Sequence, residues 1–200
     1  QDVMLPDMGS RKFLSQFDEF MWYPAEVDVS IRLGWFYHPL QRLTLKSLDH
    51  LMKIYYTSAG NNALFLLNIP PDKNGLLAKA DVRRLKEMGK WLKKEESLVI
   101  KNAERTDSDG GFQISLKFPK QSVDRVNLSE DTTKSQRVEK FSIYANSKKV
   151  FSGTIIGFSK IAVFEPVVTD ELTIKIEECR KEPYIKTAQP VATGAYRLKK

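Results

Sequence analysis

One short segment of the sequence carries polar side chains at every second position, an arrangement that suits the binding of a sugar. Written as an extended strand, residues 26–32 bring four polar side chains to one face, while Val27, Val29 and Ile31 fall on the other; the four are Glu26, Asp28, Ser30 and Arg32. Carboxylates and a guanidinium bind hydroxyl groups, and the aromatic side chains that follow Gly34 offer flat faces to a sugar ring. The pattern also fits an amphipathic edge strand with a salt-bridged ladder and an aromatic core cluster, and composition alone favours this second interpretation.

The two carboxylates of this segment have the spacing, but not the arrangement, of a catalytic pair in a glycosidase. Neighbouring same-face positions of a strand lie about 6.6 Å apart, and the two carboxyl groups of glycosidases are separated by roughly 5–9.5 Å. Glu26 and Asp28 nevertheless project from one strand toward the same side, whereas a catalytic pair flanks the glycosidic bond. We therefore do not expect them to be the catalytic pair.

The first half of the chain alternates between helix and strand patterns. Residues 45–55 carry apolar side chains at helical spacing, and Gly60 to Asn62 tolerate the left-handed conformation that closes a helix. Residues 63–69 are continuously apolar, which predicts a strand buried on both faces, and Pro70-Pro71 end it. A second helix is expected near Asp81, an acceptable N-cap. The order of helix, buried strand and helix is typical of a (β/α) barrel or a doubly wound sheet.

The chain changes character near Glu96, after which strand patterns follow one another without a convincing helix. Residues 171–177 alternate strictly between apolar and polar side chains, which predicts a strand with one buried face. We therefore predict an α/β unit over residues 1–96, followed by an antiparallel β-sandwich over residues 97–200. The expected strands of this sandwich are Gly111–Phe118, Arg137–Ala145, Lys149–Thr154, Lys160–Phe164 and Glu171–Glu177.

Composition argues against several classes of protein. The sequence has 42% hydrophobic residues but no run of eighteen apolar residues, so a transmembrane helix is not expected. The formal net charge is +7, but the lysines are scattered and their densest group suits a helix end, so we expect no nucleic-acid partner. With one cysteine and two histidines, neither an internal disulfide nor a metal site is expected. The first six residues do not resemble a signal peptide.

The aromatic and polar segment closely resembles one found in the α-L-fucosidases of glycoside hydrolase family 29. The similarity runs from Trp22 through Arg32 and into Gly34 to His38, and this motif is specific enough to reverse the preference for a mere edge strand. Similar segments cover nearly the whole chain: residues 46–48, 54–56, 66–72 and 81–85, and, resembling the C-terminal β-sandwich of that family, 136–139, 153–158 and 172–180.

This resemblance implies retaining hydrolysis of terminal α-L-fucose from glycans, without a metal or an organic cofactor. Residues 1–96 would then be the C-terminal part of a TIM-type (β/α) barrel catalytic domain, and residues 97–200 the accessory β-sandwich. The family's nucleophile is an aspartate in a Trp-Phe-Asp-Gly-like motif, which this sequence lacks. The acid/base glutamate also aligns upstream of Trp22, which leaves Glu26 as a second-choice candidate for that role. A complete barrel needs roughly 250 residues, so we expect a fragment that is inactive alone.

Carried over residue by residue, the resemblance implies a sugar pocket shared by six positions. Trp35 is expected to pack on the fucose ring or its methyl group, with His38 nearby, and Asn68 to face the site from the end of the buried strand. The other three are expected to line or brace the pocket: Glu26, Asp28 and Arg32. Leu33 departs from the family, which usually has proline there, and this loosens the turn before Trp35.

The partners implied by the family are a fucosylated glycan and an N-terminal barrel segment, on the same gene or a companion chain; neither nucleic acid nor a membrane is implied. A periplasmic, extracellular or lysosomal-type compartment is expected. The alternative is a non-catalytic protein whose β-sandwich binds carbohydrate or a protein partner. A sandwich lectin would expose aromatic side chains on one face, whereas six aromatic residues follow the alternation of a core: Phe112, Phe118, Phe141, Tyr144, Phe158 and Phe164.

Overall fold

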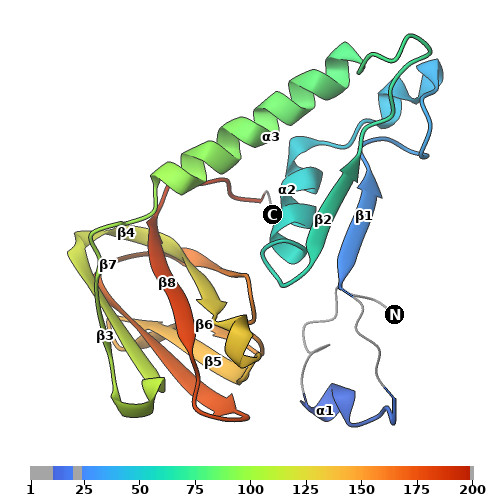
Figure 1. Ribbon diagram of the computed structural model, residues 1–200. Coiled ribbons are helices and arrows are strands. Elements are labelled where there is room, and N and C mark those ends of the chain that lie inside the picture. Colours follow the sequence, from blue (N-terminus) through green and yellow to red (C-terminus); the bar gives the residue numbers. More distant parts are fainter. Residues whose placement is uncertain (1–10, 20–23, 199–200) are drawn as a thin grey trace.

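The computed structural model describes residues 11–19 and 24–198, whose helices and strands fall into two parts (Figure 1). The first part contains α1 (Arg11–Leu14), β1 (Glu26–Ser30), the 3-10 helix η1 (Pro39–Thr44), α2 (Leu48–Thr57), β2 (Leu64–Asn68) and α3 (Lys79–Ser97). The second contains β3 (Glu104–Asp107), η2 (Asp109–Gly111), β4 (Gln113–Glu130), η3 (Thr132–Lys134), β5 (Val138–Ala145), β6 (Lys148–Gly153), β7 (Lys160–Cys179) and β8 (Ile185–Ala192). Trp22 and Tyr23 lie outside the described residues. Within those residues, we find no helix that combines the length and the apolar character needed to cross a bilayer.

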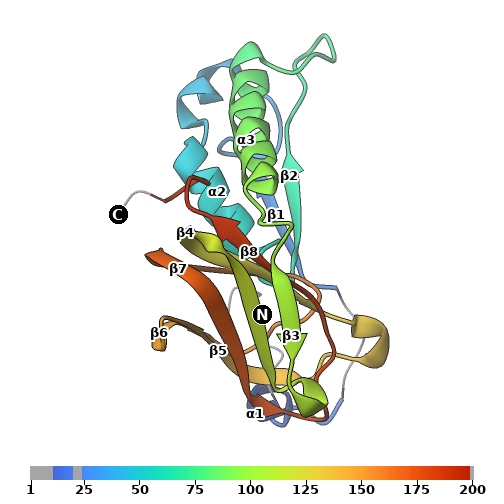
Figure 2. The same ribbon diagram turned by 90° about the vertical axis from the view of Figure 1, so that its left-hand side faces the viewer.

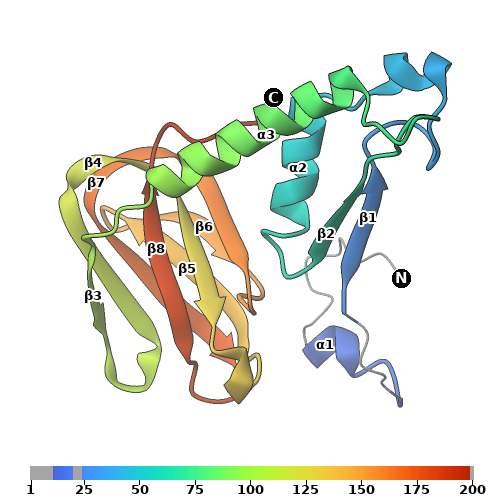
Figure 3. The same ribbon diagram turned by 45° about the horizontal axis from the view of Figure 1, so that its top comes forward.

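The two strands of the first part run parallel, and their side chains separate into a covered and an open face. Ser30 lies opposite Asn68 in the ladder, at the carboxyl ends of β1 and β2. Figure 3 shows α2 and α3 on one side of this pair, where Ile31 packs with apolar side chains of both helices. On the other face Leu64 is 56% exposed and Leu66 46% exposed, because no described element covers them. The prediction of a strand buried on both faces is therefore wrong for the described part of the chain.

Local sequence places the ends of the two long helices close to the predicted positions. The Ser47 hydroxyl caps α2 by accepting a hydrogen bond from the backbone N–H of His50 (3.1 Å). Asn62, in the turn that follows α2, has a φ of 67°, the left-handed conformation expected there. Helix α3 begins at Lys79 with Ala78 in the cap position, so the predicted capping role of Asp81 is wrong. Asp81 is instead completely buried, and its carboxylate has another partner.

The second part is rich in strand, as predicted, and its strands join into one antiparallel sheet in the order β3-β4-β7-β5-β6, with β8 paired to β4. Two strands are longer than expected, since β4 continues to Glu130 and β7 merges the two predicted strands between residues 160 and 177. Pro119 lies inside a register shift of β4, where its missing N–H interrupts no ladder bond. The sheet encloses a core of its own, to which β4, β5 and β7 contribute most of the buried side chains.

Core alternation is confirmed for three of the six aromatic residues assigned to it. Phe118, Phe141 and Phe164 are at most 7% exposed, and Tyr144 is half-buried. Phe112 and Phe158 are 45% and 56% exposed, so the prediction is wrong for these two. Both lie just outside strands, before β4 and before β7, where the two-residue alternation does not hold.

The guanidinium of Arg125 on β4 joins the two parts from the inside. It is fully buried and pairs with Glu95 near the end of α3 and with Asp124 (3.0 Å) beside it in the chain. It also donates to the Tyr56 hydroxyl on α2 (2.9 Å) and to the backbone oxygen of Tyr196 (3.1 Å). Burial alone would lower the pKa of Arg125, but the hydrogen bond with Asp124 and the charge of Glu95 outweigh burial and hold the pKa above its ordinary value. The side chain is thus a permanent cation bonded to both helices and to the C-terminal tail.

Backbone hydrogen bonds reinforce this junction beside α2. Gly60 and Asn62 lie in the turn that follows α2. The N–H of Ile161 donates to the backbone oxygen of Gly60 (2.9 Å), and the N–H of Asn62 donates to the backbone oxygen of Ser159 (3.0 Å). Just after the C-terminal end of α3, the N–H of Ile100 donates to the oxygen of Pro190 in β8 (2.9 Å). Figure 2 shows that α3 extends away from the sheet and that its C-terminal end reaches the sheet near β4 and β8. The two parts therefore contact each other through several elements.

We expect Arg125→Met to lower the free energy of unfolding by about 3–5 kcal/mol, because it leaves two buried carboxylates without their cation. Urea unfolding followed by far-UV circular dichroism measures the change. Arg197→Met is a matched control, since Arg197 forms a largely exposed ion pair with Glu165 and its removal is expected to cost less than about 1 kcal/mol. Equal unfolding midpoints for the two variants would contradict the assigned role of Arg125.

Candidate functional site

The carboxyl ends of β1 and β2 meet in a small polar cluster. The Asn68 amide nitrogen donates to the Ser30 hydroxyl (3.3 Å) and to the backbone oxygen of Trp35 (3.0 Å). Both amide protons of Asn68 thereby hold the segment that leaves β1, while its Oδ1 has no hydrogen-bond partner among the described residues. Asn68 lies at the end of its strand, where it fixes the loop that carries Trp35 and offers an acceptor.

Glu26 and Asp28 lie on the open face of the parallel pair. Both side chains are exposed, and they share that face with Ser30 and with the exposed leucines of β2. Glu26 begins β1, so it lies at the opposite end of the strand from Ser30, about 13 Å away at 3.3 Å per residue. The predicted alternation is present from Glu26 to Ser30, but of these polar residues only Ser30 lies at the carboxyl end of β1.

Arg32 does not continue the polar ladder, which corrects the prediction that it shares the face of Glu26. Strand β1 ends at Ser30, and Arg32 is only 2% exposed. Its Nε and Nη2 donate to both carboxylate oxygens of Asp81 at 2.7–2.9 Å, and its guanidinium lies 5.5 Å from the ring centre of Tyr37. Arg32 therefore braces the loop against the start of α3 from inside the molecule.

A second basic residue, Lys46, ties the same loop to the end of β1. Its ammonium donates to the backbone oxygen of Ser30 at 2.7 Å. Nearby, the N–H of Leu33 donates to the Thr44 hydroxyl at 3.0 Å, so the two ends of the loop between β1 and α2 are held together. The sequence had suggested neither Lys46 nor Asp81 as a site residue. Asp81 lies 49 positions from Arg32, and no local spacing signals such a partner.

The loop between β1 and α2 presents a group of exposed apolar side chains. Trp35 is 50% exposed, and its neighbours are more so: Leu33 67%, Phe36 86%, Leu40 78% and Leu43 86%. Gly34 adopts a φ of +82°, which permits the sharp turn before Trp35. His38 is exposed, and its Nδ1 accepts from the N–H of Leu40 (3.3 Å) as the cap of η1, so its visible role is structural.

Together these groups form an open surface suited to a polyhydroxylated ligand. The indole of Trp35 and the amide oxygen of Asn68 lie where the two parallel strands end, while the buried Ser30 supports Asn68 through its hydroxyl. No cluster of three or more His, Cys, Asp or Glu side chains in the described part of the chain is placed to hold a metal ion. The arrangement supplies binding groups, and it brings no pair of carboxylates to the carboxyl ends of the strands.

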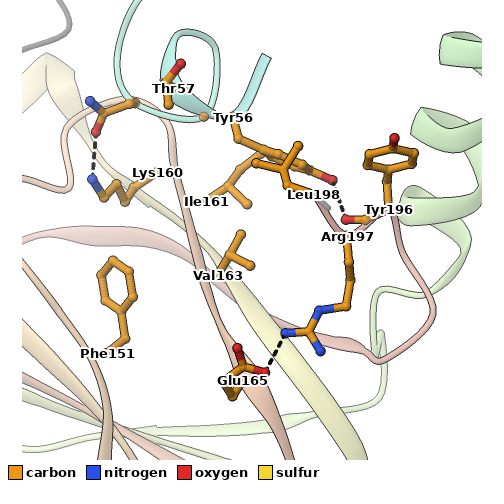
Figure 4. A pocket seen from close by; sticks show the side chains of 12 residues that line it. Tyr56, Thr57, Phe151, Lys160, Ile161, Val163, Glu165, Tyr196, Arg197 and Leu198 are labelled. Atoms are coloured by element: carbon orange, nitrogen blue, oxygen red, sulfur yellow. Dashed lines mark hydrogen bonds and ion pairs between the residues drawn. The ribbon is translucent and has the colours of Figure 1, made fainter. Parts of the chain in front are cut away.

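A hollow of about 730 Å³ lies at the junction of the two parts, and its polar side chains already make hydrogen bonds and ion pairs with other protein groups (Figure 4). The Lys160 ammonium donates to the Asn61 side-chain oxygen at 2.6 Å, and burial lowers its pKa. Arg197 pairs with Glu165 (3.1 Å), and the Tyr56 hydroxyl donates to the backbone oxygen of Tyr196 (3.2 Å). These bonds hold the tail and α2 against β7, which gives the hollow a structural explanation.

Comparison with known proteins gives a consistent result. Residues 10–97 match the family model described as alpha-L-fucosidase. Alpha-L-fucosidase 1 of Arabidopsis thaliana is 28% identical over 202 residues, which cover 82% of this chain and 40% of that protein. Putative alpha-L-fucosidase structures from Bacteroides ovatus and Bacteroides thetaiotaomicron are 38% and 30% identical, with TM-scores of 0.83 and 0.78. They match 96% and 86% of this chain but only 34% and 42% of their own, so the chain spans less than half the length of these relatives.

We expect Asp81→Asn to destabilise the protein by about 3–5 kcal/mol, because it leaves the buried Arg32 without its counter-charge. Since this pair braces the loop between β1 and α2, the same variant should be cleaved faster within residues 33–44 in limited proteolysis followed by mass spectrometry. Glu87→Gln, which removes an exposed i,i+3 partner of Arg84 on the same helix, is the control. Unchanged cleavage of the loop in Asp81→Asn would show that the pair does not position it.

Proposed function

Because the chain belongs to the α-L-fucosidase family, we propose that it is the C-terminal part of a retaining glycoside hydrolase that removes terminal α-L-fucose from glycans. The observation that carries this proposal is the meeting of Ser30, Asn68 and the Trp35 loop at the carboxyl ends of two parallel strands. Active sites of (β/α) barrels lie at that end of the strands.

The open face of the parallel pair supports the barrel interpretation. Helices α2 and α3 cover one face, as the outer helices of a barrel do, while the opposite face exposes Leu64 and Leu66. Two strands with free edges and exposed leucines do not form a stable sheet alone. We therefore propose that further strands, from the same gene or from a companion chain, complete a barrel over this face.

In this proposal, the chain contributes binding groups, and the covalent chemistry belongs to the missing strands. The indole of Trp35 packs on the sugar ring, and Asn68 Oδ1 accepts a hydrogen bond from a sugar hydroxyl. The aspartate nucleophile implied by the family motif is absent from the sequence, and without it no glycosyl-enzyme intermediate forms. Glu26 is an unsuitable acid/base candidate because it lies at the amino end of β1, away from the carboxyl edge.

The alternative of a sandwich lectin receives less support. Of the six aromatic side chains weighed for such a surface, three are buried and a fourth is half-buried. Phe112 and Phe158, the two exposed ones, precede different strands and do not alternate along one strand face. We therefore retain the hydrolase fragment as the proposed function.

The 200-residue chain alone is expected to release no 4-nitrophenol from 4-nitrophenyl α-L-fucoside above the buffer rate, because it lacks the nucleophile. Absorbance assays on the purified chain measure this, with a full-length family member as a positive control. Turnover by the purified chain at the rate of the control would contradict the proposal that this chain needs further strands for activity.

Within the completed enzyme, we expect Trp35→Ala to lower kcat/KM by about tenfold, because it removes an aromatic contact with the sugar of about 1–1.5 kcal/mol. Phe36→Ala is the matched control, since Phe36 is an equally apolar and even more exposed neighbour with no assigned contact. Steady-state kinetics on the aryl fucoside compare the two variants. Equal losses for both would remove the specific role of Trp35.

A further inference from the structure

A small polar hollow lies on the antiparallel sheet, in the other part of the molecule from Ser30 and Asn68. Its volume is about 340 Å³, at the lower end of the range of about 300–1,000 Å³ that small-ligand pockets occupy. Its walls come from the start of β4, the end of β5, the turn between β5 and β6, and residues 169–175 of β7. Most of the hollow is therefore built on paired strands, which hold side chains in fixed positions.

The ladder brings side chains from three strands to one face of the sheet. Gln113 of β4 lies opposite Lys175 of β7, and two residues earlier on β7 Thr173 lies opposite Tyr144 of β5. Because residues two apart on a strand share a face, these four side chains converge. The Lys175 ammonium lies 5.1 Å from the centre of the Tyr144 ring, so both reach the same space.

The polar groups of this hollow are largely free, unlike those of the larger junction hollow. Among the described residues, the side chains of Gln113, Tyr144, Asp170 and Thr173 make no hydrogen bond to another protein group. Glu171 is engaged, because one of its carboxylate oxygens accepts from the Ser115 hydroxyl. An amide, two hydroxyls, a carboxylate and an ammonium are thus available to a ligand in one place.

The charges around the hollow indicate the class of ligand. The carboxylates of Asp170 and Glu171 would repel a small anion, and the ammonium of Lys175 would repel a small cation. A neutral ligand with many hydroxyls uses both, since each hydroxyl donates to a carboxylate or accepts from an ammonium or an amide. The tyrosine ring adds apolar surface for the C–H groups of a sugar.

We propose that this hollow is a carbohydrate-binding site for one neutral sugar residue of a glycan, separate from the hydrolase site. Asp170 accepts from sugar hydroxyls, Lys175 and Gln113 donate to sugar oxygens, and the Tyr144 hydroxyl does either. The site needs none of the strands missing from the parallel pair. It therefore goes beyond the proposed function and does not depend on it.

Saturation-transfer NMR on the purified chain tests the proposal with three separate probes: L-fucose, D-galactose and N-acetyl-D-glucosamine, each at millimolar concentration. At least one is expected to give a protein-dependent signal. Titration of that sugar should show affinity about tenfold weaker for Asp170→Asn and for Tyr144→Phe, because each removes one hydrogen bond. These changes keep the size of the side chain, so the fold is retained, and circular dichroism checks it.

Tyr184→Phe is the matched control, because Tyr184 is a partly exposed tyrosine outside this hollow. This variant should bind the sugar with the same affinity as the unchanged chain. The proposal is overturned if none of the three sugars gives a signal, or if Asp170→Asn and Tyr144→Phe bind like Tyr184→Phe. Binding of inorganic sulfate without any sugar would also overturn it, by marking Lys175 as a simple anion contact. Absence of fucoside hydrolysis leaves this test unaffected, so the two proposals fail separately.

Discussion

Charges buried inside the protein must be paired, and helix α3 meets this requirement near both of its ends. Asp81 in its first turn holds Arg32 from the loop after β1, and Glu95 near its last turn holds Arg125 from the sheet. The fourteen-residue separation corresponds to about 21 Å along a helix. Because each guanidinium has its carboxylate at a defined point of one rigid helix, the loop between β1 and α2 and the antiparallel sheet are placed relative to each other through α3 (Figures 1 and 3).

The two parts of the chain differ in how far each one supplies its own core. The sheet encloses 18 buried apolar side chains, whereas the cluster between the parallel pair and its helices contains four. Burial of apolar surface is the main stabilising term in folding. The sheet therefore buries enough apolar side chains to be stable alone, whereas the parallel pair with its helices does not. Its contacts with the sheet, through Arg125 and the turn after α2, compensate in part for the open face.

Whether a polar side chain is available for binding depends on the hydrogen bonds it has already made. In the junction hollow, Lys160 and Arg197 have protein partners, and the hollow is explained as a joint. At the carboxyl ends of the parallel strands, Asn68 uses its two amide protons to fix the loop and keeps its oxygen free. On the sheet, the side chains of Tyr144 and Asp170 make no hydrogen bond within the part of the chain that the structure describes. The same types of residue are therefore either engaged in structural contacts or left available to a ligand, according to their neighbours.

The sequence by itself determined the order of helix, strand and helix, the β-rich second half and the resemblance to the α-L-fucosidases, because these depend on local periodicity and on contiguous motifs. It also placed Asn68 at the end of a strand. Only the tertiary structure decided that Arg32 turns inward to Asp81, that Leu64 and Leu66 are exposed, and that Gln113, Tyr144 and Lys175 share one hollow. These outcomes depend on contacts between residues tens of positions apart, and such contacts leave no period in the sequence; they arise from how the elements pack.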